Sequence, residues 1–176
     1  MDIFKDRYSV RNFKQDSIQK DCILSCLESA RIAPSACNKQ PWKFIVVDDK
    51  EIKNLITNEG LAGIHSFNKF VATAPVIVAV VAEPDIITDK LAASMQGVKY
   101  HYLDIGMACQ NFVLKAWQYD IGSCYIGWFN EKKVKKILNV PKLKKVVLLI
   151  ALGYFEKEEK NKKRKNLEEI YSFNSY

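Results

Sequence analysis

Apolar residues recur along the chain in two patterns, each predicting a different kind of element. Helical spacing predicts helices from Asp16 to Pro34 and over 50–57, 98–119 and 130–138. Short runs of strand-forming residues predict strands at 44–48, 75–83, 122–129 and 145–153. The 75–83 run is apolar on both faces, as expected of a central buried strand. Helices alternating with few strands predict an α+β or α/β class, in which helices cover a small sheet.

Local signals refine these elements. Asp16 is expected to cap the first long helix because Gln19 follows three residues later, and Pro34 is expected to end it. The segment 98–119 has few polar residues, so we expect a long central helix buried on most sides. Gly106 and Ala108 would allow another backbone to approach that helix. The tail, 154–176, is too polar to belong to the core.

Length and composition favour an ordinary soluble globular protein. The chain has 176 residues, of which 48% are hydrophobic and 27% charged, and this length suits one domain. No apolar run approaches the roughly 20 residues that span a bilayer, and the start lacks a signal-peptide pattern. Five cysteines without a C-x-x-C and two distant histidines argue against a zinc site. Free thiols fit a reducing compartment, so we expect a cytoplasmic protein without a membrane partner.

The net charge of +7 is unevenly distributed. The segment 131–145 holds seven lysines and one glutamate. A basic excess can indicate nucleic-acid binding. Here the lysines alternate with apolar residues, as in an amphipathic helix with one solvated face, and no aromatic residue among them could stack on bases. We favour the solvated helix and keep nucleic-acid binding as an alternative.

Two basic clusters could bind an anion. Arg7, Ser9 and Arg11 alternate, so in an extended segment they project to one side. Two guanidinium groups and a hydroxyl on one side suit a phosphate group. Lys162 and Arg164 form a second basic pair in the tail. Each cluster alone also fits plain solvated residues.

The stretch 33–44, APSACNKQPWKF, is unusually polar and rigid for a short connection. Ser35, Asn38 and Gln40 offer donors and acceptors, while Pro41 restrains the backbone and Trp42 supplies an apolar base. A polar rim on an apolar base is typical of a small-molecule site. A helix stop with a buried tryptophan is the alternative interpretation.

The sequence contains no G-x-G-x-x-G, P-loop, H-E-x-x-H or G-x-S-x-G motif, and no neighbouring cysteine–histidine pair. If the protein is an enzyme, a bound cofactor is therefore expected to carry the chemistry.

Four motifs follow one another along the chain: R-x-S-x-R at 7–11, P-S-x-x-N-x-Q-P-W at 34–42, G-S-C-x-I-G-W-F at 122–129 and K-x-R-x-x-L-E-E at 162–169. Their order resembles that of the nitroreductase family of FMN-dependent oxidoreductases. The resemblance extends from Arg7 to about Tyr171 and is weakest at 54–74 and 84–97.

This resemblance implies a compact nitroreductase-like α+β fold forming one domain, 1–176. The fold would have a small mixed or antiparallel central sheet flanked by helices, and a long buried central helix. Two chains would intertwine as a homodimer with FMN at each interface. The tail, 154–176, would contribute to the dimer and to the cofactor's phosphate site.

The resemblance also assigns roles to residues. Arg7 and Ser9 would contact the FMN phosphate and ribityl chain, and Arg11 the pyrimidine edge. Lys162 and Arg164 would complete the phosphate site.

The 34–40 loop would reach the flavin of the other subunit through Pro34, Ser35, Ala36 and Asn38, braced by Gln40. Ile126 and Gly127 would lie along the ring, with the backbone N–H near Gly127 directed at flavin N5, so no side chain is assigned as catalytic. Asn68 or Lys69 would reach the pyrimidine edge.

The implied activity is a ping-pong reaction in which NAD(P)H reduces the flavin. A small organic acceptor, a nitroaromatic or quinone, then takes the electrons. Reductive dehalogenation and flavin fragmentation are alternatives on the same fold. Both need specialised lid or pocket residues, and the chain is too short for a long lid insertion. Cys37 stands where many relatives have glycine or another small residue, and we interpret it as a thiol without a role. The physiological acceptor and the preference between NADH and NADPH stay open.

Overall fold

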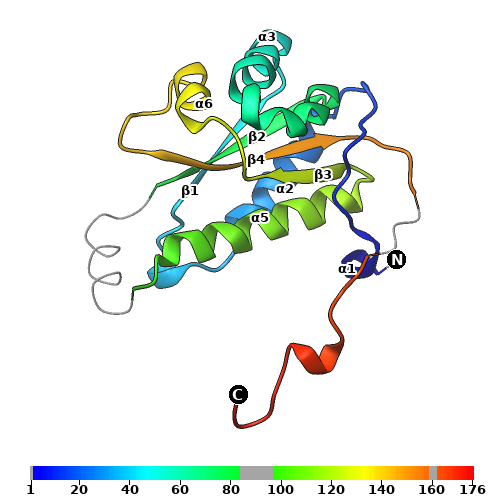
Figure 1. The fold of residues 1–176 in the computed structure, drawn as a ribbon, viewed down its shortest axis with the longest axis vertical. Coiled ribbons are helices and arrows are strands. Elements are labelled where there is room, and N and C mark those ends of the chain that lie inside the picture. The colour runs from blue at the N-terminus through cyan, green and yellow to red at the C-terminus, as the bar shows by residue number, and fades with distance from the viewer. Residues whose placement is uncertain (1, 84–96, 159–161) are drawn as a thin grey trace.

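A computed structural model describes residues 2–83, 97–158 and 162–176, and it shows a sheet between two layers of helices (Figure 1). The strands occur in the order β1-β2-β4-β3, and every neighbouring pair is antiparallel. A parallel bridge joins Ser9 to Ser123 at the β3 edge. The predicted α+β class with a small sheet is confirmed. The strands are β1 (Trp42–Val47), β2 (Val76–Ala82), β3 (Gly122–Ile126) and β4 (Lys145–Gly153).

The helices divide between the two faces of the sheet (Figure 1). One face is covered by α2 (Lys20–Arg31) and α5 (Tyr100–Gln118). The other is covered by α3 (Lys50–Leu55), the π-helical turn η2 (Ile56–Gly60), the 3₁₀ helix η3 (Gly63–Thr73) and α6 (Glu131–Ile137). Three further short elements are α1 (Ile3–Asp6), η1 (Ala36–Asn38) and η4 (Leu167–Glu169).

Strand β2 lies at the centre of both apolar cores. Ile77, Ala79 and Val81 point into the core under α3 and α6. The alternate residues Val76 and Val78 point into the core shared with α2 and α5. Because successive side chains of a strand alternate between faces, a strand covered on both sides must be apolar throughout. This explains the unbroken apolar run predicted to be a central strand.

The predicted start of the first long helix is wrong. Helix α2 begins at Lys20, after Gln19 in an extended conformation, and Asp16 does not cap it. Ile18 is buried in the core beneath α2 and α5, so the chain stays extended to bring that side chain inward. Burial of one large apolar residue outweighs a capping interaction of about 1 kcal/mol.

Helix α5 has one buried face and one exposed apolar face. Ile105, Ala108 and Phe112 are buried against the sheet and α2. Leu103 is 56% exposed and Met107 39% exposed. A Cβ added at Gly106 would meet no atom within 4 Å, whereas Ala108 faces the core. The expected burial therefore holds on one side of the helix within a single chain.

The C-terminal tail leaves the body of the molecule (Figure 1). Leu167, Ile170 and Phe173 are largely exposed on it, at 65%, 66% and 81%. The prediction that all of 154–176 lies outside the core is wrong at its start, because Phe155 is buried in one apolar core and Tyr154 packs against the other. Leu167, Ile170 and Phe173, however, are left in solvent in the single chain. Within the described ranges, no helix has both the length and the apolar character needed to cross a membrane.

Gly122 allows the N-terminal segment to lie against β3, and replacing it with alanine is expected to destabilise the fold. A Cβ there would lie 2.6 Å from both Phe155 Cδ1 and Val10 Cγ2. We expect a loss of about 1–3 kcal/mol in the free energy of unfolding, measured by urea denaturation. Gly127→Ala is the matched control, because open space surrounds that position. Equal stability of the two variants would contradict this prediction.

Candidate cofactor site

A pocket of about 370 Å³ lies where the N-terminal segment meets the tail. We call it the basic pocket. It brings together the five residues that the sequence predicted to bind an anion. Its lining consists of Arg7, Tyr8, Ser9, Val10, Arg11, Asn12, Glu156, Glu158, Lys162 and Arg164.

The N-terminal wall of the basic pocket is held by β3. The Val10 N–H donates to the Ser123 carbonyl at 3.0 Å, and Ser9 pairs with Ser123 in the parallel sense. Val10 is buried in the core, so its alternating neighbours Ser9 and Arg11 face outward. The segment runs parallel to β3, so Arg11 lies further than Ser9 toward the C-terminal end of that strand. Gly127 directly follows this end.

The tail is fastened to this wall by polar and aromatic contacts. Lys162 Nζ donates to the carbonyl oxygens of Lys5 and Arg7, the latter at 2.8 Å. The Glu158 N–H donates to Tyr8 Oη at 3.0 Å. The Tyr8 ring contacts Trp117 edge-on, with ring centroids 5.3 Å apart. These contacts fix the tail cations beside Arg7 although the two segments are distant in sequence.

The charge of the basic pocket is predominantly positive. Four of its lining residues are cationic and two are carboxylates. One carboxylate, Glu156, forms an ion pair with Lys14. The excess of guanidinium and ammonium groups suits a phosphate dianion.

The 3₁₀ helix η3 closes the other end of the site. Arg11 Cζ lies 6.0 Å from the centre of the Phe70 ring. Asn68 is 6% exposed, and its Nδ2 donates to the Trp128 carbonyl at 2.8 Å. Lys69 lines a separate cavity between η2 and η3. Of the two alternatives predicted for the pyrimidine edge, Asn68 is therefore the one held beside the 127–128 backbone.

Gly127 directly follows β3 and is exposed. A Cβ built there meets no atom within 4 Å, so the space above this backbone is open. A flat group could therefore approach the peptide closely at this point.

Cys124 is buried in β3, next to Ser123, the residue that pairs with Ser9. Burial raises the pKa of its thiol, and the nearby Arg11, Ser9 and Arg7 offset that effect only in part. A neutral buried thiol is a poor nucleophile. Cys124 is therefore not expected to act as a nucleophile.

The 34–40 loop uses its polar side chains to hold its own shape. Ser35 Oγ accepts from the Gln40 N–H at 3.0 Å, and Gln40 Nε2 donates to Asn38 Oδ1 at 3.2 Å. Cys37, Asn38 and Gln40 have φ angles of 51°, 54° and 48°. These left-handed conformations favour glycine, so Cys37 occupies a backbone position that a glycine would adopt more easily.

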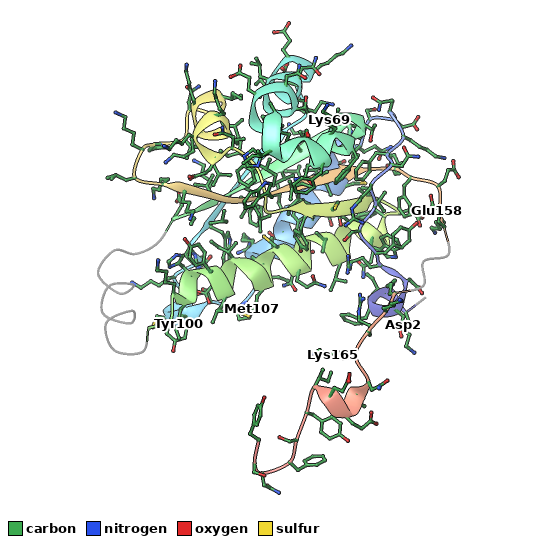
Figure 2. All side chains as sticks on the ribbon, in the orientation of Figure 1. Asp2, Lys69, Tyr100, Met107, Glu158 and Lys165 are labelled. Atoms are coloured by element: carbon green, nitrogen blue, oxygen red, sulfur yellow. The ribbon has the colours of Figure 1, made fainter. Side chains whose placement is uncertain are left out.

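The loop and the basic pocket lie near opposite ends of α5. The Ala36 N–H donates to Asp104 Oδ1 in the N-terminal half of the helix, while the pocket's Tyr8 packs on Trp117 near its C-terminus. Thirteen residues of helix separate these two anchors by about 20 Å at 1.5 Å per residue. In Figure 2, Tyr100 and the pocket residue Glu158 mark the two ends. Pro34, Ser35, Ala36, Asn38 and Gln40 therefore do not line the basic pocket of their own chain.

Sequence reasoning missed three residues that shape these sites. Tyr8 joins the N-terminal segment to the tail, Phe70 contacts Arg11, and Asp104 anchors the 34–40 loop. Only Asp104 carried a usable signal, because it is an isolated carboxylate in a largely apolar helical pattern.

The fold and the site define the class of protein. A cation-lined pocket on the segment that pairs with β3 suits an oxidoreductase that works through a bound cofactor. The chain belongs to the nitroreductase family, whose model matches residues 4–154.

Individual relatives agree with this assignment. A relative from Archaeoglobus fulgidus is 31% identical over 163 residues, covering 88% of this chain and 84% of its own. The oxygen-insensitive NADPH nitroreductase of Helicobacter acinonychis is 28% identical over 203 residues, covering 93% and 90%. The crystal structure of a nitroreductase family protein from Clostridium novyi NT superposes with a TM-score of 0.77 at 33% identity, covering 86% and 84%.

Proposed function

We propose that this protein is an FMN-dependent oxidoreductase that takes electrons from NAD(P)H. It passes them in ping-pong order to a small organic acceptor of the nitroaromatic or quinone class. The observation that carries the proposal is the basic pocket on the segment that pairs with β3, the strand that ends just before the open backbone at Gly127. The similarity to an NADPH nitroreductase over most of the chain supports the same activity.

The residues present fit FMN. Arg7, Lys162 and Arg164 would hold the phosphate, and Ser9 would face the ribityl chain. Arg11 lies four residues beyond Arg7, about 13 Å along an extended segment, which places it toward the ring end. Asn68 would complete that end. FMN, when bound, supplies the hydride-accepting ring, and the open space above Gly127 is where the ring would lie.

A second copy of the chain would complete each site. The 34–40 loop sits about 20 Å along α5 from its own basic pocket, so it can serve a cofactor only in a neighbouring molecule. Exposed apolar surfaces mark partner interfaces, and α5 and the tail both present such surfaces. We infer a homodimer in which α5 and the tail pack on the partner. Pro34, Ser35, Ala36 and Asn38 then approach the partner's FMN.

The protein's own residues act by binding and orientation. Arg11 would place a positive charge near the ring end of a bound FMN, which would favour electron uptake there. The dimer would hold nicotinamide or acceptor over the ring at about 3–3.5 Å, the distance of a near-attack geometry. All five cysteines are free thiols, which supports a reducing, cytoplasmic location.

Nucleic-acid binding is not part of the proposal. The basic segment 131–145 forms α6 and the following turn, where several lysines already have partners in the protein. Lys133 pairs with Glu59, Lys144 pairs with Glu83, and Lys135 donates to the Lys142 carbonyl at 2.8 Å. This is the arrangement expected of a solvated helix face.

The test is a flavin spectrum followed by anaerobic stopped-flow reduction with NADH and with NADPH. Reduced protein is then mixed with a nitroaromatic, a quinone or iodotyrosine. We expect bound FMN, reduction by at least one nicotinamide, and reoxidation by the first two acceptors. Protein that takes up no FMN would overturn the proposal. Turnover of iodotyrosine alone would instead indicate dehalogenation, and destruction of the flavin would indicate fragmentation.

A further inference from the structure

Asp104 is the buried carboxylate of α5. It is 4% exposed, and no other aspartate or glutamate in the described ranges is buried. It lies beside Ile105 and one turn before Ala108, both in the apolar core. Burial of a carboxylate is unfavourable unless hydrogen bonds compensate it. Its Oδ1 accepts a hydrogen bond from the Ala36 N–H at 3.1 Å, 68 residues away in sequence.

The segment that Asp104 binds has an unfavourable backbone. Three residues close behind Ala36 adopt left-handed conformations without being glycine. Hydrogen bonds from Gln40 to Ser35 and Asn38 hold the shape of the loop, but they lie within it. They cannot fix where the loop stands relative to the rest of the molecule.

Three anchors fix that position. Ala33 is buried at the start of the loop. The Glu83 N–H donates to the Pro41 carbonyl at its end, at 3.0 Å. Asp104 ties the middle of the loop to α5, the helix whose exposed apolar face is the proposed contact with the partner. The hydrogen bond from Ala36 to Asp104 thus links the loop to the proposed dimer interface.

We propose that Asp104 is a positioning residue that sets the 34–40 loop against the partner subunit's FMN. This rests on the proposed function, because the loop matters only if a flavin lies beneath it. The carboxylate holds the Ala36 N–H and so prevents the strained loop from relaxing away from the interface. Without it, the cofactor loses one wall while the basic pocket stays intact.

Three variants separate positioning from a general effect on stability. Asp104→Ala removes the acceptor, whereas Asp104→Asn retains an oxygen that can accept from the Ala36 N–H. Val113→Ala is the matched control, because this buried residue lies nine residues beyond Asp104 on the same helix and its truncation leaves a cavity.

Two readouts follow the loop and the cofactor in the dimer. The first is the FMN dissociation constant from quenching of flavin fluorescence. The second is the rate at which a thiol reagent modifies Cys37, the exposed cysteine, with Cys37→Ser as the blank. If the loop covers the partner's FMN, FMN should slow this modification in the wild-type protein.

We expect Asp104→Ala to weaken FMN binding about tenfold or more and to abolish the protection of Cys37 by FMN. Asp104→Asn should stay within about threefold of wild type, because the hydrogen bond is kept. Val113→Ala should lower the melting temperature and change neither readout. Unchanged FMN binding and Cys37 protection in Asp104→Ala would overturn the proposal, as would an equal loss in Val113→Ala.

If the proposed function itself is wrong, these experiments give a different result. Wild-type protein would then bind no FMN. The rates of Cys37 modification in flavin-free wild type and Asp104→Ala would still show whether Asp104 holds the loop. Equal rates would remove the role of Asp104 independently of FMN.

Discussion

Replacing both Arg7 and Arg11 with alanine is expected to weaken FMN binding by about 10²–10⁴-fold. Each guanidinium group would contribute a charge-assisted hydrogen bond worth about 1.5–3 kcal/mol, and each 1.4 kcal/mol is a factor of ten in affinity. Neither side chain is buried, so the free energy of unfolding of the flavin-free protein should change little. A fluorescence titration with FMN measures the effect.

The matched control is Lys132→Ala with Lys136→Ala. Both lysines are exposed on α6, and the pair removes the same two positive charges away from the basic pocket. If this control weakened FMN binding as strongly, the effect would come from net charge and not from the pocket.

Mixed dimers test whether the 34–40 loop of one chain serves the FMN site of its partner. A chain carrying Arg7→Ala and Arg11→Ala is co-expressed with a chain carrying Ser35→Ala and Asn38→Ala. If the loop serves the partner, one site of each mixed dimer combines the unchanged basic pocket with the unchanged loop. The other site combines the altered basic pocket with the altered loop. Half of the sites should then bind FMN with wild-type affinity. No wild-type site would form if each loop served its own chain.

Gly127→Val is expected to abolish function while leaving the fold intact. Open space surrounds the position, so the free energy of unfolding should change by no more than about 0.5 kcal/mol. The branched side chain would fill the space assigned to the flavin ring. A displacement of about 1 Å can cost about 100-fold in rate, so reduction by NAD(P)H should fall at least that far.

Stopped-flow reduction and an FMN titration measure this outcome. Gly127→Ala is the graded control, since its single methyl group should cause a smaller loss than valine. Normal FMN affinity and normal reduction in Gly127→Val would place the ring somewhere other than above Gly127.

Local patterns in the sequence predicted the elements that depend on local physics. The apolar run at 75–83 indicated a strand buried on both faces, and β2 is such a strand. Asp49 and Asn130 cap α3 and α6 close to the predicted starts of those helices. Helix η3 was missed: its residues 63–73 form a 3₁₀ helix in a region where we predicted no element. Burial of Ile18 likewise overrode the capping signal at Asp16.

The candidate site was predictable by residue type more than by arrangement. The alternation of Arg7, Ser9 and Arg11 indicated one shared side, and all three line the basic pocket. Ser35 and Asn38 are predicted to face a cofactor, and the structure adds that their side chains also bond to Gln40 within the loop. A motif shows which polar groups are available, but it does not show which of them form hydrogen bonds within the loop.

By itself, the sequence determined the succession of helices and strands, because burial periodicity and capping act over a few residues. It also placed the cations and the small residues of the proposed flavin site. Only the tertiary structure joined Lys162 to the Arg7 carbonyl across 155 residues and set Asn68 against Trp128. It also separated the 34–40 loop from its own basic pocket by about 20 Å of helix. These contacts and separations involve segments that are distant in sequence. They depend on the path of the whole chain and on the free energy of non-local packing, which no local pattern encodes.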